Sequence, residues 1–310
     1  MKRNRPSPVA FARRARRTAF TLIELLVVIS VIALLVSILM PCLQRARKQA
    51  GSVGCRANLH QWGNLYATYT SENDGYLPLW GGDMPAFKWY ASWWRWTWEM
   101  LGSHSSAADQ DTPDRASFAA IKDLLRCPVV GQPQFSGEDR LNAAGGTFLP
   151  WHWWFPEPPP GFLPGWYLCS SYHPNPQAHS WPRNKLDLDD APDELRFMWM
   201  TSAVKNAATA PVFFDCAGPF VRPYSDKNPP PECDAIPTVS GGTQTSEFCF
   251  NRHEGGVNYL FLDWSVRKVG LKELWTLKWH TQYNTQGPWT KAGGVLPEDW
   301  PLWMRRFKDY

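Results

Sequence analysis

The stretch Phe20-Thr21-Leu22-Ile23-Glu24-Leu25-Leu26-Val27-Val28-Ile29 decides the fold of this 310-residue chain, and its apolar character continues to Met40. As a helix, residues 20–40 would be ~31 Å long at about 1.5 Å per residue, which matches the hydrocarbon core of a membrane. Glu24 is the single charged residue in this run. A carboxylate inside a membrane span costs roughly 2–3 kcal/mol, so Glu24 indicates a function.

A basic leader precedes the apolar run. Residues 1–19 contain seven Lys or Arg residues and no acidic residue. This charge asymmetry favours a single span whose N-terminus stays in the cytoplasm. The leader carries more positive charge than the net +4 of the whole chain, so the remainder of the chain is net negative. Charge therefore gives no reason to expect a nucleic-acid partner.

The leader and the Phe20–Ile29 stretch together resemble the N-terminus of type IV prepilins and type II secretion pseudopilins. The resemblance implies that a prepilin peptidase cuts between Ala19 and Phe20 and methylates the new N-terminus at Phe20. It also implies that Glu24 assists assembly and that Pro41 kinks the helix. The family prefers glycine before the cut, and this chain has Ala19 there.

Other export signals fit the N-terminus less well. No small-residue cleavage site follows the apolar run, as an ordinary secretory signal requires, and Pro41 disrupts a lipoprotein motif at Cys42. The arginine pairs at 13–14 and 16–17 lack the flanking residues of a twin-arginine signal. An uncleaved signal anchor remains an alternative, although it gives no reason for Glu24.

The resemblance divides the chain into four parts. These are a leader (1–19), a membrane or filament-core helix (20–42), an amphipathic continuation (43–72) and an extracytoplasmic globular domain (73–310). The expected fold is α+β, with a long N-terminal helix whose first half spans the membrane, packed on an antiparallel sheet with large Trp/Pro-rich insertions. The turn signal Asn73-Asp74-Gly75 should end the helix.

Apolar residues at intervals of three and four predict which face of residues 43–72 is buried. The predicted stripe consists of Leu43, Ala46, Ala50, Val53, Ala57, Trp62, Tyr66 and Tyr69. Strands are expected at 167–172 and 210–216, and a hairpin with strands 257–262 and 265–269. Short amphipathic helices are expected at 115–126, 271–279 and 298–308.

The predicted hairpin follows His253 and contains Asp263 at its turn. This spacing resembles a segment of large pilin-like proteins, in which a histidine, nine residues and Asp-Gly follow one another. Trp264 stands where that segment has glycine. Some pseudopilins bind calcium near the C-terminus, and the resemblance makes His253, Asp263 and Asp215 candidates for such a site. Calcium takes six to eight oxygen ligands, however, and only two carboxylates can be named here. We therefore favour the interpretation that these residues form hydrogen bonds within a turn.

The chain contains seven cysteines, at positions 42, 55, 127, 169, 216, 233 and 249. In an exported protein this number suggests disulfides. Cys42, at the membrane edge, is the expected odd one, and the other six allow 15 pairings.

Taken together, these features predict a structural subunit in a type IV pilus or a type II secretion pseudopilus, not an enzyme. Its partners would be the prepilin peptidase, other pilin subunits and the inner membrane, and no cofactor is expected. The first alternative is an anchored carbohydrate-binding or adhesive module that uses tryptophans such as those at 93–98 and 151–154. The second is a membrane-anchored hydrolase, for which the sequence contains no G-x-S-x-G or H-E-x-x-H motif.

Overall fold

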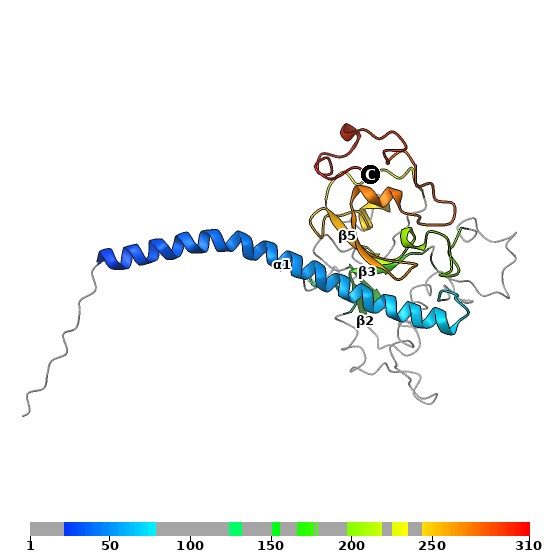
Figure 1. Ribbon diagram of the computed structural model, residues 1–310, viewed down its shortest axis with the longest axis horizontal. Helices are drawn as coiled ribbons and strands as arrows, with labels where there is room; N and C mark the ends of the chain where they lie inside the picture. Colours follow the sequence, from blue (N-terminus) through cyan, green and yellow to red (C-terminus); the bar gives the residue numbers. More distant parts are fainter. Residues whose placement is uncertain are drawn as a thin grey trace, which may run out of the picture. The chain divides into compact units, whose positions relative to one another are not determined.

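The computed structural model describes residues 22–78, 124–131, 151–155, 166–176, 178, 197–218, 225–234 and 244–310 (Figure 1). The leader, the residues on both sides of the expected cleavage, the 93–98 segment and most of the predicted 115–126 helix lie outside these ranges. The chain divides into two compact units, residues 1–47 and residues 48–310. The second unit is called the body below.

The N-terminal helix α1 runs from Leu22 to Glu72 and continues through Pro41. It ends at the predicted turn, where Asp74 and Gly75 take positive φ angles of 52° and 80°. The Gly75 N–H donates to the Thr70 carbonyl at 2.7 Å, which satisfies one of the last carbonyls of the helix. The predicted end of the helix is therefore confirmed.

The body contains a four-stranded antiparallel sheet with the order β3-β4-β5-β6. Its strands are β3 (Tyr172–Pro174), β4 (Pro211–Asp215), β5 (Gly256–Phe261) and β6 (Val266–Gly270). A separate antiparallel pair consists of β1 (Trp151–Phe155) and β2 (Trp166–Ser170). The predicted strand at 210–216 and the predicted hairpin are confirmed. The predicted strand at 167–172 is divided between β2 and β3.

The C-terminal half of α1 packs on this sheet, which confirms the α+β architecture. Ring contacts fix the rotation of the helix about its axis, because the ring centroids of Trp62 and Tyr66 lie 4.8 and 6.3 Å from that of Phe213 in β4. Residues one and two turns before Trp62 then face the sheet as well. The buried residues of α1 are Cys55, Leu59, Trp62, Gly63, Tyr66 and Thr70.

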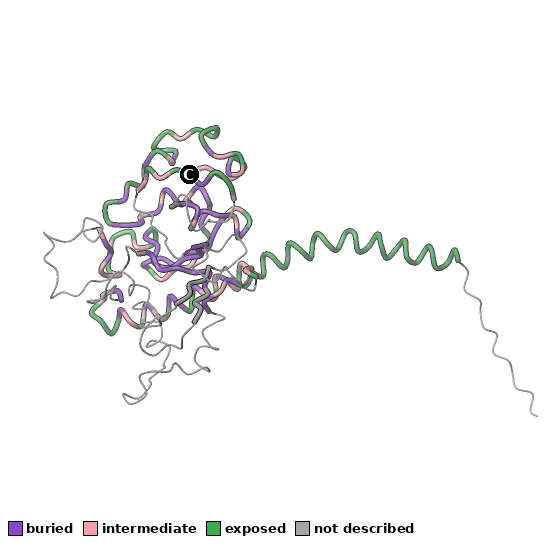
Figure 2. Tube along the Cα trace, turned by 180° about the vertical axis from the view of Figure 1, so that it is seen from behind, coloured by how far each residue is buried: buried purple, intermediate pink, exposed green. Residues whose placement is uncertain are grey.

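The first part of the predicted stripe is therefore wrong. Leu43 and Val53 are 50% and 56% exposed, and Ala46, Ala50 and Ala57 are exposed as well. Over residues 43–57 the prediction relied mostly on small apolar residues, whereas the large side chains at 59, 62 and 66 determine which face is buried. Figure 2 shows the change along the helix, which is exposed over its first half and becomes progressively buried in the body.

The predicted helices at the C-terminal end are also wrong. Only short 3₁₀ turns form there, η5 (Lys272–Thr276) and η6 (Pro297–Asp299). Residues 271, 274, 275, 277 and 279 are all buried, which a single helical face cannot achieve. The chain becomes extended at Leu277, and the Trp279 indole then donates to the Leu274 carbonyl at 2.9 Å.

Every tryptophan whose side chain the structure describes is buried or half-buried. The largest contributors, Trp62, Trp279 and Trp300, are at most 1% exposed. These rings therefore serve as core, which is the usual use of so much apolar area. The 93–98 and 151–154 tryptophans, on which a sugar-binding surface would depend, lie outside the side chains described.

The β5–β6 turn shows that tryptophan can take the place of glycine here. Trp264 has φ 65°, in the left-handed region that glycine favours. Its ring stacks on Tyr66 with the centroids 6.1 Å apart. Asp263 accepts hydrogen bonds from the Ser265 N–H and hydroxyl at 3.0 and 2.6 Å. Ring packing and this local network hold the turn in spite of the backbone strain.

Comparing two substitutions at Trp264 isolates that strain. Both Trp264→Gly and Trp264→Ala remove the ring, but only alanine keeps a Cβ at positive φ. We therefore expect Trp264→Gly to be more stable than Trp264→Ala by about 1 kcal/mol. Chemical unfolding of the two purified variants measures the difference. Equal stabilities would show that the turn relaxes once the ring is gone.

Candidate functional site

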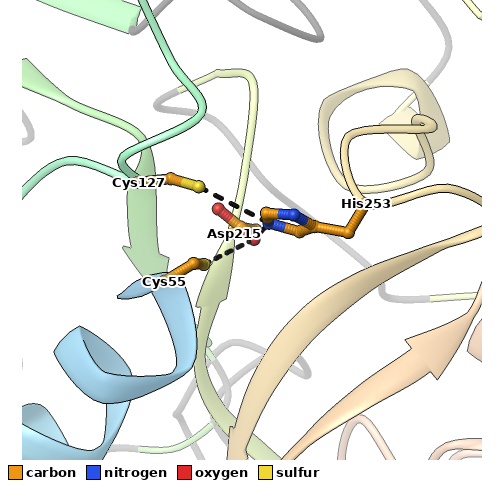
Figure 3. A group of neighbouring side chains, drawn as sticks. All are labelled: Cys55, Cys127, Asp215 and His253. Atoms are coloured by element: carbon orange, nitrogen blue, oxygen red, sulfur yellow. Dashed lines mark hydrogen bonds and ion pairs between the residues drawn. The ribbon is translucent and has the colours of Figure 1, made fainter. Parts of the chain in front are cut away.

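Four side chains with chemically active atoms meet in the interior of the body (Figure 3). Cys55 comes from the buried face of α1, and Cys127 from the turn at 124–130. Asp215 is the last residue of β4, and His253 lies in the loop before β5. The structure thus brings together two thiols, a carboxylate and an imidazole, and we call this group the Cys–His–Asp cluster.

The donor atoms of the cluster all lie within 4.8 Å of one another. The Cys55 thiol donates to Asp215 Oδ2 at 3.1 Å, and His253 Nε2 lies 2.9 Å from the same oxygen. The Cys127 sulfur lies 3.5 Å from His253 Nε2. Three of the side chains are fully buried and His253 is 4% exposed.

Backbone and side-chain hydrogen bonds hold the turn that carries Cys127. The Asn58 amide donates to the Arg126 carbonyl at 3.0 Å, and the Trp62 indole donates to the Leu124 carbonyl at 3.1 Å. The Cys127 N–H donates to the Ser171 hydroxyl at 2.6 Å. The Cβ that a side chain would need at Gly54 would lie 3.0 Å from the Pro128 ring, so glycine lets α1 approach this turn closely.

Arg252 is the buried counter-ion of the cluster. Its guanidinium donates to Asp215 Oδ1 at 2.9 Å and to the Ser171 and Cys216 carbonyls at 3.3 and 3.2 Å. Both side chains of the Arg252–Asp215 pair are fully buried. Arg252 thus fixes one carboxylate oxygen and leaves the other directed toward His253 and Cys55.

Burial and these charges shift the pKa values of all four side chains of the cluster. Burial raises the pKa of Asp215, but Arg252 and His253 outweigh it and hold the pKa below its ordinary value. Burial lowers the pKa of His253, and Asp215 more than reverses this, raising the pKa to about 9. Burial also raises the pKa of the Cys55 thiol. For Cys127, the Cys55 and His253 hydrogen bonds outweigh burial and lower the pKa to about 6.

The cluster has the composition of a cysteine-hydrolase triad but not its geometry. In a triad one imidazole nitrogen faces the nucleophile and the other is hydrogen-bonded to the acid. Here Cys127 and Asp215 both contact the same nitrogen, Nε2 of His253. Cys127 is also fully buried. The arrangement therefore favours a structural role over nucleophilic catalysis.

Among the residues considered for a metal site, for which hydrogen-bonded turn residues were the favoured interpretation, His253 and Asp215 come together and Asp263 does not. Asp263 is exposed at the β5–β6 turn and bonds within that turn. Sequence reasoning assigned Cys55 and Cys127 to disulfides and missed their place beside His253. Their sequence separations from their partners, 160 and 126 residues, give no local spacing that would have indicated it.

The expected disulfides are not formed by the cysteines whose side chains the structure describes. Cys42 and Cys233 are exposed, Cys55, Cys127, Cys216 and Cys249 are buried, and no disulfide joins any two of these six. The sulfurs of Cys55 and Cys127 engage a carboxylate and an imidazole, respectively.

The second functional region is the N-terminal part of α1. From Leu22 to Ala50 every residue is exposed, and the apolar side chains here include Leu22 and Ile23, at 77% and 73%. None of this apolar part is buried, and α1 is long and apolar enough to cross a membrane. Such a surface needs lipid or other apolar helices around it. Glu24 lies in the first turn of α1.

Comparison with known proteins identifies this region. Residues 14–40 match the family model of the prokaryotic N-terminal methylation motif. No curated protein and no solved structure matches the chain.

The motif and the exposed apolar helix are features of membrane-anchored proteins of the type that receives N-terminal methylation. The N-terminus of the chain is accordingly that of a type IV prepilin- or pseudopilin-like protein, as its sequence predicted.

Proposed function

We propose that this chain is a structural subunit that is cut between Ala19 and Phe20, methylated at Phe20 and assembled into a filament. The observation that carries the proposal is the methylation motif at residues 14–40, which continues into an apolar helix exposed along its whole first half. The filament is either a type IV pilus or a type II secretion pseudopilus. The prepilin peptidase and other pilin subunits are its partners.

Before assembly, the subunit crosses the inner membrane once. The basic leader stays in the cytoplasm because translocation of its seven positive charges is disfavoured. The body lies on the opposite side, in the periplasm or outside the cell. In the filament, the residue 20–40 helices exchange lipid contacts for contacts with one another, which gives little hydrophobic gain. Polar pairing through Glu24 then sets the register between subunits.

Processing provides the direct test. N-terminal mass spectrometry of the membrane-fraction protein should find a methylated chain that begins at Phe20. Ala19→Leu should leave the leader attached, because the bulky side chain replaces the small residue before the cut, and Ala19→Gly should speed the cut.

Cells without prepilin peptidase are the control, and they should accumulate the full-length chain. An intact leader in cells with active peptidase would overturn the proposed processing. The protein would then be an uncleaved, anchored module.

A further inference from the structure

We propose that the Cys–His–Asp cluster is a zinc site, in which Cys55, Cys127, His253 and Asp215 bind one Zn²⁺ that joins α1 to the sheet. The site is independent of the proposed filament function. It lies entirely in the body, and it is distinct from a calcium site at Asp263, which the structure leaves on the surface.

The donor atoms lie near enough to one another for a tetrahedral zinc site. With zinc–ligand bonds of about 2.0 to 2.3 Å, the donor atoms of such a site lie about 3.3 to 3.8 Å apart. The distances between donors here are 2.9 Å from His253 Nε2 to Asp215 Oδ2, 3.1 Å from Cys55 Sγ to that oxygen, and 3.5 Å from Cys127 Sγ to Nε2. Zinc therefore requires the two shorter distances to lengthen by a few tenths of an ångström, and the widest separation, up to 4.8 Å, to shorten by about 1 Å.

The donor types select zinc over calcium or magnesium. Two sulfurs, one imidazole nitrogen and one carboxylate oxygen suit a borderline-soft ion, whereas calcium and magnesium take oxygen ligands. The four ligands are all protein atoms, as in structural zinc sites, which have no open position for a substrate. Burial of the cluster agrees with a structural site.

The charges of the occupied site sum to zero. Zn²⁺ and Arg252 supply three positive charges, and two thiolates and the Asp215 carboxylate supply three negative ones. Arg252 holds Asp215 Oδ1 at 2.9 Å, so Oδ2 is directed at the metal position. Such outer contacts orient metal ligands in known sites. A buried ion would thus bring no uncompensated charge into the interior.

Tyr172 is a neighbour of the site. Its ring is fully buried, and its hydroxyl lies beside Cys55. Metal binding displaces the thiol proton and leaves a thiolate. The Cys55 thiolate would accept a hydrogen bond from the Tyr172 hydroxyl.

Metal content of the full-length protein tests the site. The protein is purified in detergent without chelator, and its metals are quantified by mass spectrometry. We expect about one zinc per chain in the wild type, as four ligands bind one ion. Cys55→Ala and Cys127→Ala should lose the zinc. Cys249→Ala is the matched control, because Cys249 is also a buried free thiol but lies outside the cluster.

Cobalt substitution keeps the test decisive if a variant fails to fold. After removal of zinc, Co²⁺ bound to the wild type by two thiolates should give sulfur-to-cobalt charge-transfer absorption and the strong visible bands of tetrahedral cobalt. Zinc should also raise the melting temperature of the wild type and of Cys249→Ala. A folded wild type that binds neither metal would overturn the proposal, as would a Cys55–Cys127 disulfide in the purified protein. Zinc lost equally from Cys249→Ala would overturn it too.

Discussion

Replacing Arg252 with methionine is expected to destabilise the body by about 3 to 5 kcal/mol, because it leaves the buried Asp215 carboxylate without its guanidinium partner. Both side chains of this pair are fully buried, so water cannot take over the lost contacts. The Ser171 and Cys216 carbonyls lose hydrogen bonds as well. Chemical unfolding, followed by tryptophan fluorescence, measures the loss.

Arg267→Met is the matched control for this substitution. Arg267 also pairs with a carboxylate, that of Glu273, and also lies over a phenylalanine ring at 4.5 Å, as Arg252 does. Its side chain is 38% exposed, however. Exposed ion pairs contribute about 0 to 1 kcal/mol, so the control should be nearly as stable as wild type. Equal losses for the two variants would show that burial of the Asp215 pair has no special importance.

Glu24→Val should block filament assembly while leaving processing intact. Cleavage before Phe20 would expose an amine one helical turn from Glu24, where the helix dipole already favours a carboxylate. In the filament core, that amine would remain charged and buried without its partner. Breaking such a pair costs about 3 to 5 kcal/mol, which predicts a drop in polymer of about a hundredfold or more.

The measurement is the ratio of sheared extracellular polymer to processed membrane subunit. Ser37→Val is the control, since it also replaces a polar side chain of the span. The Ser37 hydroxyl bonds within its own helix, to the Leu34 carbonyl at 2.7 Å. This variant should assemble as wild type does. Normal polymer from Glu24→Val would mean that the protein is an anchored module with a pilin-type helix.

Local signals predicted the elements of this protein well. The end of α1 and the β5–β6 hairpin depend on turn residues and on alternation within a few positions. The buried face of α1 was harder to predict, because Trp62 and Tyr66 fix it through contacts with Phe213, about 150 residues away. Small alanines at helical spacing were a weaker guide than large rings.

The Cys–His–Asp cluster could not be predicted for a related reason. Its four members lie on separate elements, and only the folded sheet brings Asp215 beside His253 and α1 beside both. The sequence indicated disulfides between the cysteines of the body. What each sulfur contacts instead depends on the side chains that the fold places around it. Cys249, equally buried, lies outside the cluster.

The continuity of α1 has a mechanical consequence for a subunit held in a filament. In the proposed filament, tension on residues 22–40 would pass along α1 and enter the body where side chains first become buried, at Cys55. Cys55, Asn58 and Trp62 occupy successive positions on this part of the helix and contact β4 or the 124–130 turn. A force along the helix axis would act on these contacts at the same time, so that each bears part of it. The packed surface between the helix and the sheet would therefore resist extraction of the helix.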